Sequence, residues 1–245
     1  KSPARVSPHS LAANDALSGR RASHCGLPAP WTAPMKAPLT PLAGHDVLFV
    51  MAAEAEFGPH LRARIAPLMI GVGPVEAAIN TATALNLLQL AGTPPDLVVS
   101  LGSAGSARLD HCGLYQATEV AWRDMDATAL GFARGVTPFL DLPASLPLPL
   151  RLPGIPTASL STGANIVSGD GYASIDQDMV DMETYAVLRA CMVQNVPLIA
   201  LRGISDGQAG LTGLQDWTQY LHLIDHKLAS AIDILETALF NAHLR

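Results

Sequence analysis

Lysine, cysteine and long apolar runs are scarce in this 245-residue chain, and each scarcity excludes a class of protein. Lysine occurs only at positions 1, 36 and 227 and no GxxxxGK[ST] motif is present, which excludes ATP chemistry built on a loop lysine. The three cysteines lack metal-ligand spacing, so we expect reduced thiols, no metal and no other cofactor. No apolar run reaches the roughly 18 residues that cross a bilayer, so we expect no membrane span.

Charge is unevenly distributed along the chain. Residues 1–44 hold five basic residues and one acidic residue, whereas residues 45–245 hold ten basic and twenty acidic residues. Because so acidic a body would repel a phosphate backbone, we expect no nucleic-acid partner. The N-terminus also lacks the apolar middle region of a secretory signal, which with the sparse cysteines favours a cytoplasmic protein.

Composition divides the chain into two parts. Residues 1–44 contain seven of the 19 prolines and no periodic hydrophobic pattern, so we expect a flexible, Pro-rich N-terminal extension there. A targeting peptide is the alternative for this segment, since it is poor in acidic residues and contains Arg and Ser. Residues 45–245 are predicted to form one domain, and 49% hydrophobic residues overall suffice for a substantial core.

Strand-like and helix-like patterns alternate through residues 45–245. Apolar runs predict buried strands at 46–53, 68–72, 97–101 and 197–204, with weaker strands at 115–122 and 157–160. Helices are expected at 74–90, 183–194 and 214–240, and the Pro-rich stretch 138–156 is expected to be surface loop. This alternation predicts a three-layer α/β/α single domain with a central mixed, largely parallel sheet.

Two glycine-rich turns resemble known motifs but lack a defining residue or spacing. Gly71-Val72-Gly73 is followed by Glu76, where a dinucleotide fingerprint needs glycine. The stretch 102–105, Gly-Ser-Ala-Gly, lacks the GxSxG spacing of a serine hydrolase. Its small residues at a strand end let a ligand approach backbone N–H groups, although a plain tight turn would look the same.

Three carboxylates follow or begin predicted elements. Glu56 and Asp206 each follow a buried strand, and Glu183 begins a helix. Each alone could serve as a helix cap or favour a helix N-terminus. Together they predict one ligand site at the sheet edge, and acidic groups suit N-glycosidic cleavage because the ribose develops oxocarbenium charge. Tyr172, in a further Gly-rich turn, could stack on a flat base.

Six short motifs occur in an order that resembles the purine nucleoside phosphorylase superfamily. They are Ala52-Ala53-Glu54-Ala55-Glu56, Gly71-Val72-Gly73, Leu101-Gly102-Ser103-Ala104-Gly105, Ser168-Gly169-Asp170, Asp181-Met182-Glu183 and Arg202-Gly203-Ile204-Ser205-Asp206. Within the superfamily the chain is most similar to the 5′-methylthioadenosine/S-adenosylhomocysteine nucleosidases, over about residues 45–240. The resemblance implies a nucleoside phosphorylase-like fold, a homodimer, and release of adenine and a 5-thio-ribose.

The resemblance also implies a role for each matching residue. Asp206 corresponds to the general acid at purine N7, with Ser205 orienting it. Glu183 corresponds to the clamp on the ribose hydroxyls, and Glu56 to the group that holds the attacking water together with Ser103 and Arg202. The remaining implied substrate-binding residues are Ala104, Gly105, Tyr172, Ala173 and Met182.

The chain departs from the family pattern near the implied pocket. The segments 58–70 and 171–180 are shortened, and Asp181 stands where the family has Glu. No arginine precedes Gly102, where the phosphorylases carry one for phosphate, so water is the favoured nucleophile. The alternatives are a futalosine-type hydrolase, a phosphate-dependent phosphorylase, and a non-catalytic nucleoside-binding paralogue.

Overall fold

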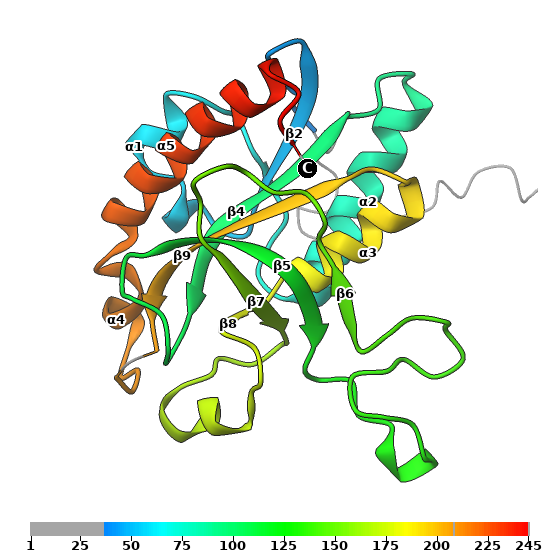
Figure 1. Ribbon diagram of the computed structural model, residues 1–245, viewed down its shortest axis with the longest axis vertical. Helices are drawn as coiled ribbons and strands as arrows, with labels where there is room; N and C mark the ends of the chain where they lie inside the picture. The colour runs from blue at the N-terminus through cyan, green and yellow to red at the C-terminus, as the bar shows by residue number, and fades with distance from the viewer. Residues whose placement is uncertain (1–36, 208, 245) are drawn as a thin grey trace, which may run out of the picture. The chain divides into compact units, whose positions relative to one another are not determined.

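The computed structural model describes residues 37–207 and 209–244 (Figure 1). The predicted flexible extension therefore lies largely outside the described residues. Its last part is described: β1 (Thr40–Leu42) pairs antiparallel with β2 (His45–Met51). β1 lies within the segment predicted as the flexible extension, and it extends the edge of the sheet.

A nine-stranded mixed sheet forms the centre of the described chain, as predicted. Besides β1, one parallel group contains β2, β3 (Leu68–Met69), β4 (Leu97–Gly105) and β9 (Leu198–Asp206). A second parallel group contains β5 (Leu114–Trp122), β7 (Thr157–Thr162) and β8 (Met179–Asp181), and β6 (Ser145–Pro147) pairs antiparallel with β5. Pairings run from β4 through β9, β5, β7 and β8 back to β4, so these five strands close a ring.

Helices cover the sheet on two sides (Figure 1). On one side α2 (Pro74–Leu90) packs against α3 (Thr184–Gln194). On the other side α1 (Pro59–Arg62) packs against α5 (Leu221–Phe240), with the short α4 (Leu214–Thr218) before it. Three-residue 3-10 helices are η2 (Glu54–Glu56) and η3 (Thr128–Leu130), and a longer one is η4 (Gly169–Ser174). Within the described ranges, no helix combines the length and apolarity of a membrane span.

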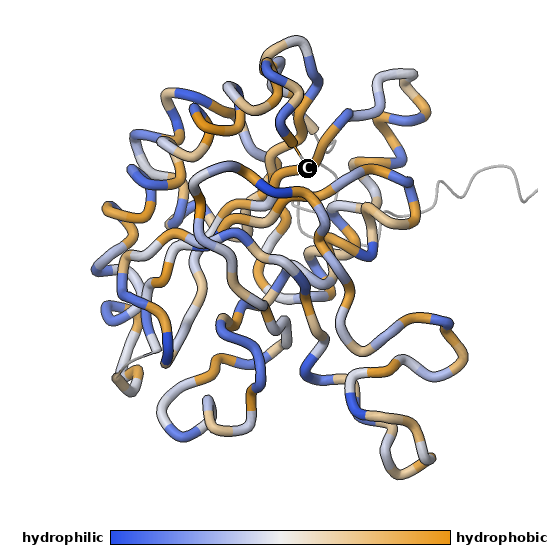
Figure 2. Tube along the Cα trace, viewed as in Figure 1, coloured by the Kyte–Doolittle hydropathy of each residue, from blue (hydrophilic) through white to orange (hydrophobic). Residues whose placement is uncertain are grey.

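The main core lies between the parallel strands and α5. Phe49, Val99 and Leu201 from the strands meet Leu228 and Leu235 from α5, and all five side chains are buried. Figure 2 shows the hydrophobic stretches that run along the central strands. Since these strands are covered on both faces, they appear in the sequence as continuous apolar runs.

The structure corrects several boundaries. The stretch predicted as surface loop, 138–156, contains β6, and Leu146, Leu148 and Leu152 within it are buried. The single helix predicted at 214–240 is divided into α4 and α5, and the strand predicted at 68–72 ends at Met69. Asp181 ends a strand, while Glu183 precedes the first residue of α3.

Gly203 in β9 is predicted to be essential for packing between the sheet and α5. A Cβ at this position would overlap Ile224 Cγ2 and lie 2.8 Å from Ile224 Cγ1. Because Ile224 is itself buried, we expect Gly203→Ala to lower the free energy of unfolding by about 1–3 kcal/mol in chemical denaturation. Gly213→Ala is the control, because nothing lies within 4 Å of its Cβ position. Equal midpoints for both variants would contradict the prediction.

Candidate active site

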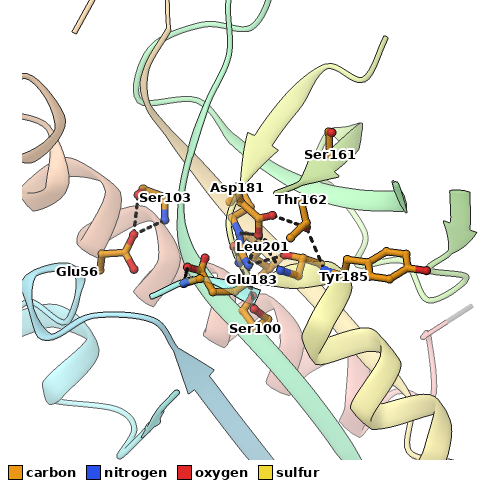
Figure 3. Close-up of polar contacts among 12 residues, drawn as sticks. Glu56, Ser100, Ser103, Ser161, Thr162, Asp181, Glu183, Tyr185 and Leu201 are labelled. Carbon is orange, nitrogen blue, oxygen red and sulfur yellow. Dashed lines mark hydrogen bonds and ion pairs between the residues drawn. The ribbon is translucent and has the colours of Figure 1, made fainter. Parts of the chain in front are cut away.

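Two of the three predicted carboxylates, Glu56 and Glu183, meet at the edge where β2, β4 and β9 end, whereas Asp206 contacts Ser205 and Tyr172 and does not line the same pocket. Glu56 comes from η2 after β2, and Glu183 from the turn between β8 and α3 (Figure 3). Between them lies a pocket of about 10 Å³, about the room that one water molecule needs. Its lining residues are Ala52, Glu56, Ile70, Ser100, Leu101, Gly102, Ser103, Glu183 and Arg202.

Glu56 is held by Ser103. The backbone N–H and the hydroxyl of Ser103 both donate to Glu56 Oε1, at 2.7 Å and 2.5 Å. Burial raises the pKa of the Glu56 carboxyl, and the two Ser103 hydrogen bonds oppose that rise. Trp217 Nε1 donates to Ser103 Oγ at 2.9 Å, which leaves the Ser103 proton directed at Glu56. Sequence reasoning missed Trp217, which lies on α4.

Glu183 is a buried carboxyl at the start of α3. Its Oε1 accepts a hydrogen bond from the backbone N–H of Gly73, 2.9 Å away. Gly73 has φ +95°, a conformation that favours glycine, and it precedes α2. Burial, and then the nearby Asp181 carboxylate, raise the pKa of Glu183 to about 7, against the opposing effect of the Gly73 hydrogen bond. This carboxyl therefore exchanges its proton near neutral pH.

Stability is expected to fall with rising pH because of Glu183. Its folded pKa of about 7 exceeds the ordinary value of 4.5, so between these values the folded chain binds more protons than the unfolded chain. The free energy of unfolding should therefore decrease from pH 5 to pH 7.5, by on the order of 3 kcal/mol from this group. Glu183→Gln should flatten the decrease in urea titrations, whereas Glu236→Gln, on exposed α5 surface, should leave it. Parallel pH profiles for wild type and Glu183→Gln would contradict this assignment.

Asp181 and Arg202 form a buried ion pair behind the pocket. Arg202 Nη2 lies 3.0 Å from Asp181 Oδ2, and both side chains are almost fully buried. The other acceptors of the guanidinium are the Ser100 carbonyl and hydroxyl, the Leu201 carbonyl and the Thr184 hydroxyl. Each of its three nitrogens thus donates to protein oxygens. The resemblance implied a contact between Arg202 and the attacking water, and these protein partners differ from it.

The Asp181 carboxylate accepts hydrogen bonds from several neighbouring groups. Thr162 Oγ1 donates to Asp181 Oδ1 at 2.6 Å, and the backbone N–H of Thr184 donates to Oδ2 at 3.0 Å. The Thr184 hydroxyl also contacts Asp181 Oδ2. Although Asp181 is shorter than the Glu of the family, both of its carboxylate oxygens therefore accept hydrogen bonds.

Asp206 lies at the end of β9 and accepts two hydrogen bonds. Ser205 Oγ donates to Oδ2 at 2.7 Å, which agrees with an orienting role for Ser205. Tyr172 from η4 donates to Oδ1 at 3.5 Å, the outer limit for a hydrogen bond. A Cβ at Gly105 would be 2.7 Å from Asp206 Oδ1 and would overlap the Tyr172 hydroxyl. A side chain at position 105 would therefore require the Tyr172 hydroxyl and the Asp206 carboxylate to shift.

The other predicted residues lie around these groups. Ala104 is buried in β4, Met182 is half-buried between β8 and α3, and Ala173 is exposed on η4. None of the predicted site residues lines the larger cavity, of about 560 Å³, which is bordered by η4 and by the ends of β5 and β7. Among the described residues, no cluster of three or more His, Cys, Asp or Glu side chains could hold a metal ion.

Known proteins resemble this chain in sequence. It is 34% identical over 165 residues to the 5′-methylthioadenosine/S-adenosylhomocysteine nucleosidase of Haemophilus influenzae (strain 86-028NP), covering 60% of this chain and 69% of that protein. The corresponding nucleosidase of Actinobacillus succinogenes is 32% identical over 167 residues, covering 60% and 70%. No family model matches the chain.

Solved structures resemble it in fold. The nucleosidase of Campylobacter jejuni superposes with a TM-score of 0.65 at 18% identity, covering 79% of this chain and 100% of that one. A futalosine hydrolase mutant of Helicobacter pylori gives a TM-score of 0.64 at 17% identity, covering 77% and 97%. These likenesses confirm the predicted nucleoside phosphorylase-like α/β fold. With more than two thirds of a 34% identical relative matched as well, the chain belongs to the 5′-methylthioadenosine/S-adenosylhomocysteine nucleosidase family, a family of N-glycosyl hydrolases.

Proposed function

We propose that this chain hydrolyses the N-glycosidic bond of 5′-methylthioadenosine or S-adenosylhomocysteine, releasing adenine and a 5-thio-ribose. The observation that carries the proposal is the water-sized pocket lined by Glu56, Ser103 and Glu183. A carboxylate with a raised pKa beside a space for one water is the arrangement that a general base needs.

Glu56 is the proposed base for the attacking water. Its Oε1 accepts both hydrogen bonds from Ser103, and no hydrogen bond described for the chain uses Oε2. Oε2 is thus available to accept a proton from a water in the pocket. As the water oxygen bonds to C1′, the C1′–N9 bond breaks and its electron pair goes to the purine.

In this proposal Glu183 acts on the ribose and Asp206 on the purine. Glu183 has one carboxyl oxygen bound to Gly73, and the other is proposed to hold the ribose hydroxyls over Met182. Its charge stabilises the oxocarbenium character that develops on the ribose. Asp206, oriented by Ser205, donates its proton to N7, so the purine leaves as a neutral molecule.

Water is favoured over phosphate by the charges around the pocket. Three carboxyl groups, Glu56, Asp181 and Glu183, lie within electrostatic reach of one another, and the nearby cation Arg202 is paired with Asp181. A phosphate dianion would be repelled there, and it would also need more room than the pocket offers.

Adenine release from a nucleoside panel tests the proposal. The panel contains 5′-methylthioadenosine, S-adenosylhomocysteine, adenosine and futalosine, each with and without phosphate. We expect phosphate-independent turnover of the two thio-nucleosides. Phosphate-dependent turnover would indicate a phosphorylase, turnover of futalosine alone a futalosine-type hydrolase, and binding without turnover a non-catalytic paralogue.

The proposal includes a homodimer. Leu130 and Phe139 lie in the long connection between β5 and β6, and 76% and 94% of their surfaces are exposed. Figure 1 shows this connection, in green, extending away from the sheet. Exposed large apolar residues of this kind are common at protein–protein contacts. Light scattering should give twice the chain mass, and Phe139→Ser should shift the mass toward the monomer.

A further inference from the structure

The Tyr172 hydroxyl occupies the place beside Asp206 that a bound base needs. It lies 3.5 Å from Asp206 Oδ1 and against the Gly105 backbone, where even a Cβ would overlap it. The other carboxylate oxygen, Oδ2, already accepts from Ser205 at 2.7 Å. A purine can take a proton from Asp206 only with N7 at hydrogen-bond distance, about 2.6–3.2 Å, from one of these oxygens.

Space at Glu56 and Glu183 is also too small for a nucleoside. The pocket there has about 10 Å³, whereas small-molecule sites have roughly 300–1,000 Å³. At Asp206 itself, the Tyr172 hydroxyl fills the place beside Oδ1, so a base that reaches this oxygen must move the phenol.

We propose that Tyr172 is a gating and positioning residue, whose hydroxyl donates to Asp206 in the unliganded enzyme and is displaced by the purine base. The inference rests on the proposed role of Asp206 as the general acid. Before substrate binds, Ser205 and Tyr172 each donate a hydrogen bond to one oxygen of Asp206. When the base displaces the phenol, N7 takes its place beside Oδ1, at hydrogen-bond distance from the Asp206 carboxyl.

The surroundings of Tyr172 keep it a donor. Burial, and then the Asp206 carboxylate, raise the pKa of its phenol, so the hydroxyl keeps its proton at neutral pH. The positive charge of Arg123, beyond the end of β5, opposes this rise in the pKa of the phenol. Gly105, from β4, lies beside Asp206 Oδ1 and does not titrate.

The fold leaves room for the displacement. The outer side of η4 borders the cavity of about 560 Å³, with Ser168, Gly171, Ser174 and Ile175 among its lining residues. Tyr172 packs against the small cluster Val167, Ile175 and Val180, and two members of this cluster, Val167 and Ile175, also line the cavity. Because the cavity borders both η4 and this cluster, η4 has free space into which it can shift.

Tyr172→Phe tests the gate because it keeps the ring and removes the hydroxyl. KM should fall about three- to tenfold, the effect of one ordinary hydrogen bond. The value of kcat should not change, because the phenol is already displaced in the complex. Tyr220→Phe, against His111 at the start of α5, is the matched control.

Adenine binding separates this inference from the proposed function. Calorimetry should give a Kd for adenine about three- to tenfold lower in Tyr172→Phe than in wild type, whether or not the chain turns over a nucleoside. Unchanged adenine affinity and KM in Tyr172→Phe would overturn the gate, and so would equal changes in Tyr220→Phe.

Discussion

Asp206→Asn is expected to lower kcat by about 10²–10⁴-fold with little change in the fold. Asparagine keeps the size of the side chain and can still accept from Ser205, but it has no acidic proton for N7. The purine would then leave as an anion, which raises the barrier of the bond-breaking step. Because the loss arises in the transition state, kcat and kcat/KM should fall together while KM changes little.

The measurement is the steady-state release of adenine from 5′-methylthioadenosine, with folding followed by circular dichroism. Asp141→Asn, in an exposed loop between η3 and β6, is the matched control for the loss of one carboxylate. Activity of Asp206→Asn within a few-fold of wild type would remove Asp206 from the acid role. It would also remove the basis of the gating role of Tyr172.

Strands buried on both faces were the easiest part of the fold to predict. β2, β4 and β9 are continuous apolar runs, and α2 begins at a proline that suits a first helical turn. β6 and β8 were missed because three-residue strands carry no period, and β6 also ends in a proline. The break between α4 and α5 was missed because neither glycine nor proline marks it.

Site residues at strand ends were predicted because parallel strands bring their carboxyl ends to one edge. Their partners were not, since those depend on register. Gly102 lies opposite Arg202 in the β4–β9 pairing, which brings the guanidinium to Ser100 and Asp181. Trp217 gave no signal, because its contact with Ser103 spans 114 positions and depends on how α4 is placed.

Arg202→Met is expected to lower the free energy of unfolding by about 3–5 kcal/mol. The substitution leaves the Asp181 carboxylate buried without its cation, and it leaves the Ser100 and Leu201 carbonyls without their side-chain donor. A buried charge without a partner cannot be solvated by water, so the folded state bears the cost. Urea denaturation of wild type and variant measures the difference.

Arg64→Met is the matched control because it also removes one arginine from an ion pair. The Arg64–Asp233 pair is exposed, with 39% and 53% of the two side chains accessible, so its loss should cost at most about 1 kcal/mol. A cost below about 1 kcal/mol for Arg202→Met as well would contradict the prediction that the buried pair contributes more than an exposed one.

A double variant identifies the origin of the cost. If the unpaired charge of Asp181 dominates, adding Asp181→Asn to Arg202→Met should recover part of the lost stability, with a coupling energy of roughly 1–3 kcal/mol. The two charges also act in opposite directions on the neighbouring carboxyls: Asp181 raises the pKa of Glu183 and of Glu56, and Arg202 lowers both. On Glu183 the effect of Asp181 is the larger, so the pKa of Glu183 should rise in Arg202→Met and fall again in the double variant. Recovery of stability without that fall in the pKa of Glu183 would mean that the two effects have separate origins.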